Sequence, residues 1–231
     1  MKFHLLTIFP DFFEGPFKFG VVARGAEFGA LELRVHDLRK WTHDLHRTVD
    51  DRPFGGGEGM VLKPEPIFDA VESIWPEKNS KQKVILLSAQ GRKFTQRVAR
   101  ELALHDELLL ICGRYEGVDE RVAEHLADEE LSIGDYVLSG GELAAAVVVD
   151  TVARLLPGVV GNQESTVNES FEDAGMLDCP QWTRPAEFRG WKAPDVLLGG
   201  NHAEIRKWRK QAAREKTARR RPDLLTGGGS A

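Results

Sequence analysis

Three short segments, each rich in glycine and small polar residues, follow apolar runs: Ser88–Gly91, Gly113–Gly117 and Ile133–Gly141. Glycine lets the backbone turn tightly and approach a ligand closely. Backbone amides that lead into a helix N-terminus suit a polar or ring-shaped ligand. Taken alone, Gly140 and Gly141 are explained equally well as the end of one element and the start of the next. Three such loops together favour the binding of a ligand through backbone groups, and their apolar flanks suit an adenine-bearing cofactor.

Several common site patterns are missing from the sequence. The glycine run Gly55–Met60 lacks the Gly-Lys-Ser/Thr ending of a phosphate-binding P-loop, and no segment has the Gly-x-Gly-x-x-Gly dinucleotide pattern. There is no Gly-x-Ser-x-Gly nucleophile motif. His43 and His46 lie three residues apart without a third metal ligand in pattern. A Rossmann dehydrogenase, a kinase-like enzyme and a serine hydrolase are therefore disfavoured.

The charge of the chain is unevenly distributed. Residues 206–221 hold nine Lys or Arg and one acid, a local charge of +8 within a net charge of −5, so the rest of the chain carries −13. A solvated charged helix is the usual explanation of a basic run. One acid among nine bases is an unusual imbalance for such a helix, and it predicts a polyanionic partner that binds at this place.

Composition indicates an ordinary globular protein, with 231 residues of which 42% are hydrophobic and 29% charged. The longest apolar run, Leu143–Val149, is too short to cross a membrane. The apolar start Phe3–Phe9 is ended by Pro10 too early for a signal peptide. Cys112 and Cys179 are far apart and in no metal-type spacing, which argues against a disulfide framework. We therefore expect a cytoplasmic protein without a membrane anchor.

Apolar runs alternate with amphipathic segments along the first 155 or so residues, which predicts an α/β fold with a largely parallel sheet. The expected strands are Lys2–Phe9, Leu31–Val35, Lys83–Ser88, Glu107–Ile111 and Glu129–Ile133. The expected helices are Pro16–Arg24, Pro64–Ile74, Phe94–Leu104, Val118–Leu126 and Gly141–Leu156. The three glycine loops then lie at the carboxyl ends of strands, where open α/β sheets bind ligands.

The chain is expected to have two domains. Pro157 and Gly158 stop the last helix of an α/β domain over residues 1–157. Residues 158–170 are polar and irregular and are interpreted as a flexible linker. Residues 171–231 form a small, mainly helical, basic domain with a helix from about His202 to Lys216. The glycine-rich tail Thr226–Ala231 is expected to be floppy.

Four motifs carry a resemblance to a known family: Asp50–Met60, Cys112–Arg121, Ser132–Glu142 and Leu198–Arg206. They closely resemble the bacterial tRNA (guanine-N1)-methyltransferases, which modify the guanine on the 3′ side of the anticodon. The similarity runs in order from the first strand to about Leu225. It implies an S-adenosylmethionine-dependent enzyme of the SPOUT class, whose α/β domain contains a deep trefoil knot made by the three loops. It also implies a tRNA substrate, an active site built across a homodimer interface, and dependence on Mg²⁺.

The resemblance assigns residues to the cofactor and to the substrate. The cofactor-binding residues are Leu87, Ser88, Gly113, Ile133, Gly134, Asp135, Tyr136, Val137, Leu138, Gly140 and Gly141. The substrate-binding residues are Asp50, Gly59, Arg114, Tyr115 and Glu116, joined by Lys207, Arg209 and Lys210 of the basic helix. A turn or cap is the alternative for Asp50, and burial in the core is the alternative for Tyr115. The metal-ligand pattern that Mg²⁺ would need is not visible in the sequence.

Methylation of guanine N1 removes the N1 proton and moves negative charge towards O6. It therefore requires a general base near N1 and a cation or donor near O6. Arg154 stands where the family has its guanine-stabilising arginine, although an ion pair with Asp150 on the same helix face would also explain it. Glu169 stands where the family has an aspartate, and it is assigned as the base with a side chain one methylene longer. Capping or solvation of the linker is the alternative for Glu169.

Two other functions compete with this assignment. One is a SPOUT methyltransferase that modifies a different nucleotide or a ribose, against which the linker carboxylate argues, because a ribose methylase would activate a hydroxyl. The other is a cofactor- and RNA-binding protein that has lost turnover, which Glu169 in place of aspartate would favour.

Overall fold

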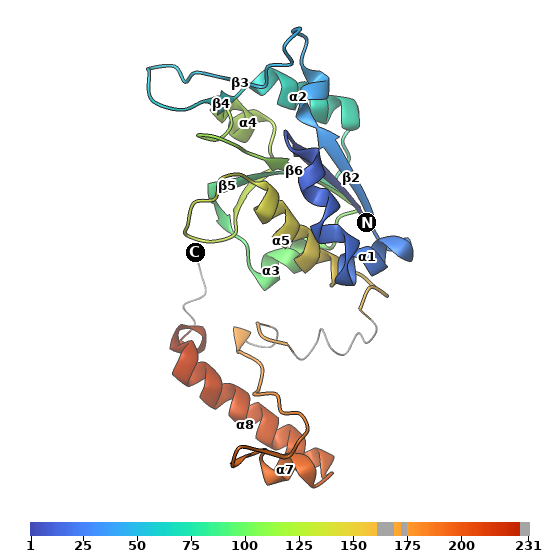
Figure 1. Ribbon diagram of the computed structural model, residues 1–231, viewed down its shortest axis with the longest axis vertical. Helices are drawn as coiled ribbons and strands as arrows, with labels where there is room; N and C mark the ends of the chain where they lie inside the picture. Colours follow the sequence, from blue (N-terminus) through green and yellow to red (C-terminus); the bar gives the residue numbers. More distant parts are fainter. Residues whose placement is uncertain (161–168, 172–174, 227–231) are drawn as a thin grey trace. The chain divides into compact units, whose positions relative to one another are not determined.

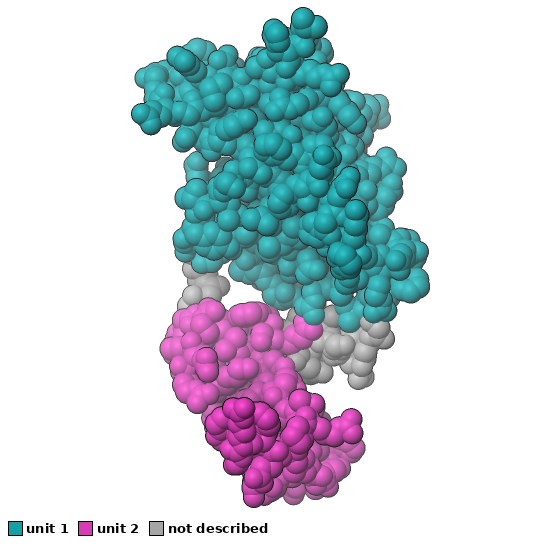
Figure 2. Space-filling view, viewed as in Figure 1, with its two compact units in different colours: residues 1–161 teal, residues 162–231 magenta. Residues whose placement is uncertain are grey.

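The structure is a computed structural model that describes residues 1–160, 169–171 and 175–226. The chain divides into two compact units, Met1–Gly161 and Asn162–Ala231 (Figure 2). Most of the expected linker, and most of the glycine-rich tail, lie outside the described residues.

The first unit is built on a five-stranded sheet in the order β2-β1-β6-β5-β7, in which every neighbouring pair is parallel (Figure 1). Its strands are β1 (Lys2–Thr7), β2 (Glu32–Asp37), β5 (Gln82–Lys93), β6 (Glu107–Cys112) and β7 (Glu129–Ser132). This confirms the α/β class and all five strands expected from the sequence. β5 is longer than expected because it resumes its pairing with β7 after a loop.

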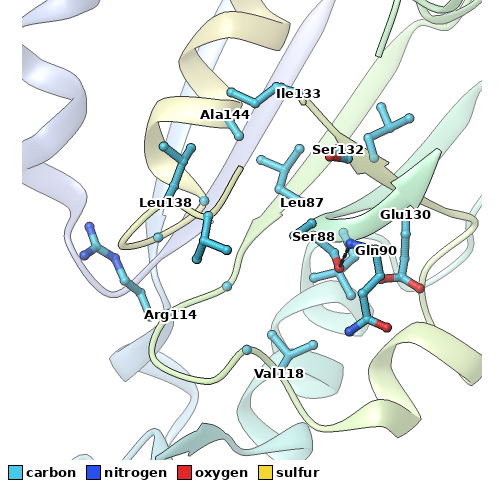
Figure 3. A pocket seen from close by; sticks show the side chains of 18 of the residues that line it. Leu87, Ser88, Gln90, Arg114, Val118, Glu130, Ser132, Ile133, Leu138 and Ala144 are labelled. Atoms are coloured by element: carbon cyan, nitrogen blue, oxygen red, sulfur yellow. Dashed lines mark hydrogen bonds between the residues drawn. The ribbon is translucent and has the colours of Figure 1, made fainter. Parts of the chain in front are cut away.

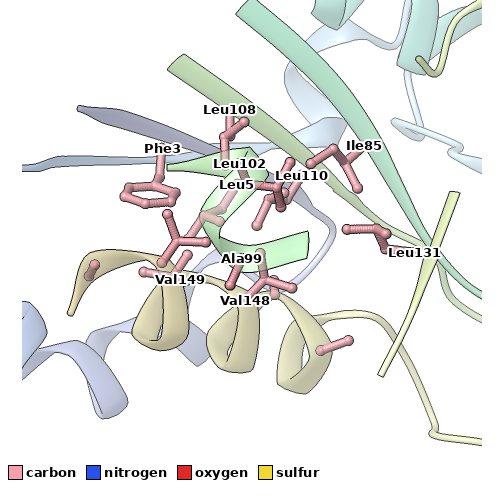
Figure 4. Close-up of a cluster of buried hydrophobic side chains, with 14 of the residues drawn as sticks. Phe3, Leu5, Ile85, Ala99, Leu102, Leu108, Leu110, Leu131, Val148 and Val149 are labelled. Atoms are coloured by element: carbon pink, nitrogen blue, oxygen red, sulfur yellow. The ribbon is translucent and has the colours of Figure 1, made fainter. Parts of the chain in front are cut away.

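Both faces of the sheet are covered by helices, as a parallel sheet requires. Along β6, Leu108 and Leu110 pack into one buried cluster, and Leu109 and Ile111 into another. Figure 1 shows α1, α3 and α5 on one side of the sheet and α2 and α4 on the other. Figure 4 shows the first cluster, where Val148 and Val149 of α5 meet Leu5 and Leu110 of the strands. Removing this apolar surface from water is what holds α5 on the sheet.

The helices of the first unit are α1 (Gly20–Glu27), α2 (Pro64–Ile74), α3 (Gln96–Leu102), α4 (Glu120–His125) and α5 (Glu142–Ala153). Thr95 caps α3 and Asp119 caps α4 by accepting a backbone N–H bond from the first turn. The predicted helix Pro16–Arg24 was wrong at its start. Pro16–Lys18 is a short 3-10 turn, and α1 begins at Gly20 because Phe19 before it has extended backbone (φ −134°, ψ 161°).

Short elements complete the unit, and the sequence pattern did not predict them. They are the 3-10 turns η1 (Pro10–Glu14), η2 (Pro16–Lys18) and η3 (Leu38–Trp41), and the antiparallel pair β3 (Asp50–Asp51) and β4 (Val61–Leu62). The β3–β4 pair holds the base of the glycine-rich segment between them.

The second unit contains α7 (Asp195–Leu198), α8 (His202–Arg220), the 3-10 turn η5 (Pro222–Leu225) and an antiparallel hairpin, β8 (Glu187–Phe188) with β9 (Trp191–Lys192). Asn201 caps α8 through its side-chain oxygen. α8 was expected to end near Lys216 and continues one turn further. Thr217 on this last turn is fully buried and accepts a hydrogen bond from the Leu177 amide at 3.0 Å.

In the part of the chain that the structure describes, no helix is long and apolar enough to cross a membrane.

Candidate active site

A cavity of about 220 Å³ lies beside the 88–91 loop of β5 and the carboxyl ends of β6 and β7 (Figure 3). The three glycine loops named from the sequence meet around it. Its lining includes these predicted cofactor residues: Leu87, Ser88, Gly113, Ile133, Gly134, Tyr136, Val137, Leu138, Gly140 and Gly141. Asp135 is not part of the lining. Its exposed carboxylate pairs instead with Lys93 at 3.2 Å.

The cavity has an apolar part and a polar part. Figure 3 shows Leu87, Ile133 and Leu138 gathered at one end, with Gln90 and Glu130 at the other. Between these ends, the Ser88 hydroxyl accepts a hydrogen bond from the backbone N–H of Gln90 at 3.2 Å. Such a cavity suits a ligand with a flat apolar ring and polar groups attached to it.

Two glycines allow the loops to approach one another. The Gly141 amide donates to the Gly113 carbonyl at 2.9 Å, and a Cβ at Gly141 would lie 2.8 Å from the Cα of Cys112. A Cβ at Gly91 would collide with the backbone of Glu130, next to the point where β5 passes β7. Leu87 and Arg92 both pair with Leu131, so residues 88–91 leave the ladder as a loop and return to the same place. A larger residue at either glycine would push the segments apart.

A buried network ties the second loop to the third and to β1. Arg114 donates to one carboxylate oxygen of Glu142, from Nε at 2.9 Å and from Nη2 at 2.8 Å. The Thr7 hydroxyl donates to the other oxygen at 2.7 Å, and Glu142 is only 1% exposed. Arg114 also donates to the Ser139 carbonyl at 3.2 Å, and its guanidinium lies 4.5 Å from the centroid of the Phe9 ring. The network holds Arg114 in the wall of the cavity.

The remaining substrate residues of this unit divide between two places. Tyr115 and Glu116 line the cavity beside Arg114, and Tyr115 has positive φ (60°) and a half-exposed ring. The ring is therefore not a core residue. Asp50 and Gly59 do not line the cavity, but they lie close to it. Gly59 packs on Glu116, where a Cβ would meet the carboxylate at 2.6 Å, and Asp50 pairs with Leu62, whose amide donates to the Gly117 carbonyl.

The two residues assigned to catalysis belong to different units. Arg154 follows α5 as its C-cap in the first unit. Glu169 belongs to the second unit, where the residues after it are anchored. The Asp178 amide donates to the Ser170 hydroxyl at 3.0 Å, and the Phe171 amide donates to the Met176 carbonyl at 2.7 Å. Asp178 is in turn held by Lys216 of α8, which donates to its carbonyl at 3.0 Å.

Helix α8 presents its cations on more than one face. Lys207, Lys210 and Arg214 lie at helical spacing and border a hollow of about 550 Å³, whose other walls include Met176 and Leu225. Arg209 is exposed but does not border this hollow. Of the three residues predicted to bind tRNA, Lys207 and Lys210 therefore border the hollow together with Arg214, and Arg209 does not.

Metal and thiol chemistry receive no support from the described residues. Over residues 1–160, 169–171 and 175–226, no group of three or more His, Cys, Asp or Glu side chains could hold a metal ion. The donor set thus gives no support to the Mg²⁺ dependence that the resemblance implies. Burial raises the pKa of the Cys112 thiol well above its usual value, and the nearby Glu142 carboxylate adds to this. Cys112 is therefore a core residue rather than a nucleophile.

Sequence reasoning missed several residues of the site. Glu142 does not line the cavity, but it is the most important of them because it holds Arg114 at the cavity wall. The signal for it was a carboxylate at the start of a helix that is otherwise apolar over its next seven residues. Gln90 and Glu130, at the polar end, carried no such signal. Ser132 lines the cavity and is buried, and its hydroxyl donates to the Gly134 carbonyl at 3.0 Å.

Comparison with known proteins gives one consistent result. A family model described as tRNA (Guanine-1)-methyltransferase TrmD matches residues 1–227. A protein of Koribacter versatilis named tRNA (guanine-N(1)-)-methyltransferase is 56% identical over 98% of this chain and 93% of its own length. Relatives of the same name from Dehalococcoides mccartyi and Halalkalibacterium halodurans are 53% and 52% identical, over 97% and 98% of this chain and 90% and 92% of their own lengths.

Proposed function

Because the chain belongs to the TrmD family of tRNA (guanine-1)-methyltransferases, we propose that it methylates the guanine on the 3′ side of the anticodon. It is an enzyme that transfers a methyl group to N1 of guanine in tRNA. A methyltransferase of this family uses S-adenosylmethionine, which supplies a methyl group activated on a sulfonium. The observation that carries the proposal is the meeting of three glycine loops around one cavity, beside the 88–91 loop of β5 and the carboxyl ends of β6 and β7.

The cavity is proposed as the cofactor site because its residues fit the two kinds of group that the cofactor carries. The apolar end at Leu87, Ile133 and Leu138 would hold the adenine ring. At the polar end, the Glu130 carboxylate would accept hydrogen bonds from the ribose hydroxyls, and the Gln90 side-chain amide would donate to them or accept from them. Gly140 leaves room for the Arg114 side chain and Gly141 for the Cys112 backbone, which lets the loops close around the cavity.

In the chemical step, we assign the proton transfer to Glu169 and the stabilisation of charge to Arg154. The Glu169 carboxylate would take the proton from guanine N1, which contributes about 10²- to 10⁴-fold to the rate when the base is well placed. The Arg154 guanidinium would stabilise the charge that develops on O6. Anchoring of Ser170 and Phe171 on the second unit supports a defined position for the Glu169 backbone.

The tRNA is proposed to bind α8 through its phosphates. Lys207 and Lys210 border the same hollow as Arg214, and an array of three cations on one helix face attracts a phosphate backbone. An enzyme acting on tRNA works where tRNA is found, so a cytoplasmic location goes with this substrate.

A homodimer is proposed because α5 leaves apolar side chains uncovered in one chain. Leu143 is 52% exposed and Val147, one turn later, 43% exposed. A helix that is apolar on all sides is normally buried on all sides. A second copy of the chain would cover this face. A charge in this face, as in Val147→Glu, is expected to shift the sedimentation coefficient from that of a dimer to that of a monomer. Leu104→Glu, which changes an exposed leucine outside α5, should leave it unchanged.

The deep trefoil knot of the SPOUT class is also proposed for this chain. Two observations support it. Residues 88–91 leave the pairing of β5 with β7 and return to it at the same residue of β7, and Gly141 packs on the Cys112 backbone. The proposed domain scheme keeps the knotted domain at residues 1–157, the linker at 158–170 and the basic domain at 171–231.

The product of the reaction tests the proposed function. The full chain is incubated with labelled S-adenosylmethionine and unmodified tRNA transcripts, and the labelled nucleotide is mapped by nuclease digestion and mass spectrometry. 1-Methylguanosine next to the anticodon is the expected product. Label on another nucleotide or on a ribose would move the substrate assignment, and binding of both ligands without label would indicate a protein that has lost turnover.

A further inference from the structure

The hairpin formed by β8 and β9 carries two exposed aromatic rings on a rigid turn. Phe188 pairs with Trp191, and Glu187 pairs with Lys192. The two turn residues, Arg189 and Gly190, both have positive φ (53° and 83°), as a two-residue hairpin turn of type I′ requires. Arginine is uncommon in this conformation. The turn therefore holds a long cationic side chain at a place where Asn or Gly would fit more easily.

The pairing separates two kinds of side chain. Glu187 and Lys192 lie 3.6 Å apart as an ion pair. The Phe188 and Trp191 rings have centroids 6.3 Å apart and are tilted by 48°, and the Arg189 guanidinium lies 5.2 Å from the centroid of the Phe188 ring. Phe188 is 55% exposed and Trp191 68% exposed. An aromatic pair with a cation beside it thus faces outward.

The size of this aromatic pair argues against a stable protein interface. An aromatic side chain buries roughly 150–250 Å² when it is covered, and here only about half to two thirds of each ring remains to be covered. The two rings together offer roughly 200–300 Å², well below the ~800 Å² per partner of a standard interface. A small flat ligand matches the area better.

The charge around the rings indicates what that ligand carries. Residues 184–192 carry three positive charges and one negative charge: Arg184, Arg189 and Lys192 against Glu187. Cations next to aromatic faces attract a flat group that is linked to negative charge. An unpaired nucleobase with its phosphates has both properties, and a base stacks on an aromatic side chain without regard to its identity.

We propose that the Phe188–Trp191 hairpin is a stacking platform for an unpaired base of the RNA substrate, separate from the cations that border the α8 hollow. The inference rests on the proposed function, because it assumes that tRNA is the substrate. The two surfaces would contribute different kinds of interaction to tRNA binding. The α8 cations contribute a salt-dependent attraction to phosphates, and the hairpin contributes stacking that salt hardly changes.

The test measures the dissociation constant for an unmodified tRNA transcript at several salt concentrations, with full-length protein. Trp191→Ala is compared with Trp191→Phe, which keeps an aromatic face, and with Phe28→Ala, which removes an aromatic ring that is 71% exposed in the first unit. Trp191→Ala should weaken binding by about 5- to 100-fold at every salt concentration with an unchanged salt slope. Trp191→Phe should retain most of the affinity, and Phe28→Ala should bind like the wild type.

Other outcomes overturn the inference. Equal tRNA affinity of Trp191→Ala and wild type would exclude stacking on Trp191. A loss of affinity accompanied by a change in sedimentation coefficient would assign the hairpin to a contact with a second copy of the chain. S-adenosylmethionine binding by each variant controls for folding. If the wild type itself neither binds nor methylates tRNA, the proposed function fails first, which separates the two failures.

Discussion

The partly exposed Arg114 guanidinium pairs with the buried Glu142 carboxylate and so joins the second loop of the cavity to the third. The guanidinium reaches Glu142 with two nitrogens at 2.8 and 2.9 Å, and the carboxylate is 1% exposed. Breaking a buried pair by removing one partner leaves an uncompensated charge, which is costly. The pair therefore specifies how the two loops meet, and with them the wall of the proposed cofactor site.

Neutralising Glu142 tests this relationship. Glu142→Gln keeps the size of the side chain, but it removes the charge that faces Arg114 and turns one of the two acceptor oxygens into a donor. We therefore expect a loss of roughly 2 kcal/mol in unfolding free energy and at least tenfold weaker S-adenosylmethionine binding by calorimetry. Glu101→Gln removes an exposed partner of Arg92 and Arg97 and should cost under about 1 kcal/mol. Cofactor affinity equal to that of the wild type in Glu142→Gln would mean that the pair does not shape the site.

A methyl group at Gly141 should separate the loops. Its Cβ would lie 2.8 Å from the Cys112 Cα, and backbone gives way less easily than a side chain. We expect Gly141→Ala to destabilise the protein by about 1–3 kcal/mol and to weaken cofactor binding. Gly15→Ala is the matched control, because nothing lies within 4 Å of its Cβ position and its φ of −79° suits alanine. Similar melting temperatures for the two variants would refute the proposed close approach.

The cations of α8 are expected to act through salt-dependent binding. A triple variant in which alanine replaces Lys207, Lys210 and Arg214 should bind tRNA more weakly. The slope of log affinity against log salt should fall in magnitude by up to about three. The Lys207, Arg209 and Lys210 triple variant serves as the comparison, because Arg209 does not border the same hollow. S-adenosylmethionine binding should survive in both. An unchanged salt slope in the first variant would show that this face does not contact phosphates.

Stability should fall in mild acid because of a histidine pair on the sheet. His4 Nδ1 lies 2.9 Å from His36 Nε2, which leaves room for one proton between them. Burial, followed by the neighbouring His4, lowers the pKa of His36 from 6.5 to about 4. The unfolded chain therefore takes up a proton at a higher pH than the folded chain does.

The contribution of His36 is fully present above pH 6.5 and is lost as the pH falls from 6.5 towards 4, by up to about 3 kcal/mol. Urea unfolding at a series of pH values measures it. His36→Gln should flatten the curve in this window, and His46→Gln, which changes an exposed histidine, should not. A curve for His36→Gln as steep as that of the wild type would contradict the assignment.

The sequence predicted the sheet and most helices because their patterns are local. Within the expected strand Glu107–Ile111, Leu108–Ile111 is a continuous apolar run, as a strand buried on both faces must be. Pro64–Ile74 has both helical spacing and a proline at its first turn. The start of α1 could not be read in the same way. It depends on the extended backbone of Phe19, which the apolar pattern through Pro16–Arg24 does not reveal.

The loops of the candidate site could be predicted from the sequence, but the contacts between its side chains could be predicted only in part. The positions of Gly113 and Gly141 in the loops follow from their place after strands. The pairing of Arg114 with Glu142 joins residues 28 positions apart, and no local spacing shows it. The division of the α8 cations between two faces does follow from helical periodicity, which would have placed Lys207 with Lys210 and Arg214 rather than with Arg209.

The assignment of Glu169 as general base is the central chemical claim, and the single-turnover rate of methyl transfer tests it most directly. With saturating cofactor and tRNA, Glu169→Gln should lower this rate by about 10²- to 10⁴-fold while the dissociation constants of both ligands change by less than about threefold. Glu169→Asp, which keeps the carboxylate, should retain most of the rate. A Glu169→Gln rate close to that of the wild type would contradict the account and require another base.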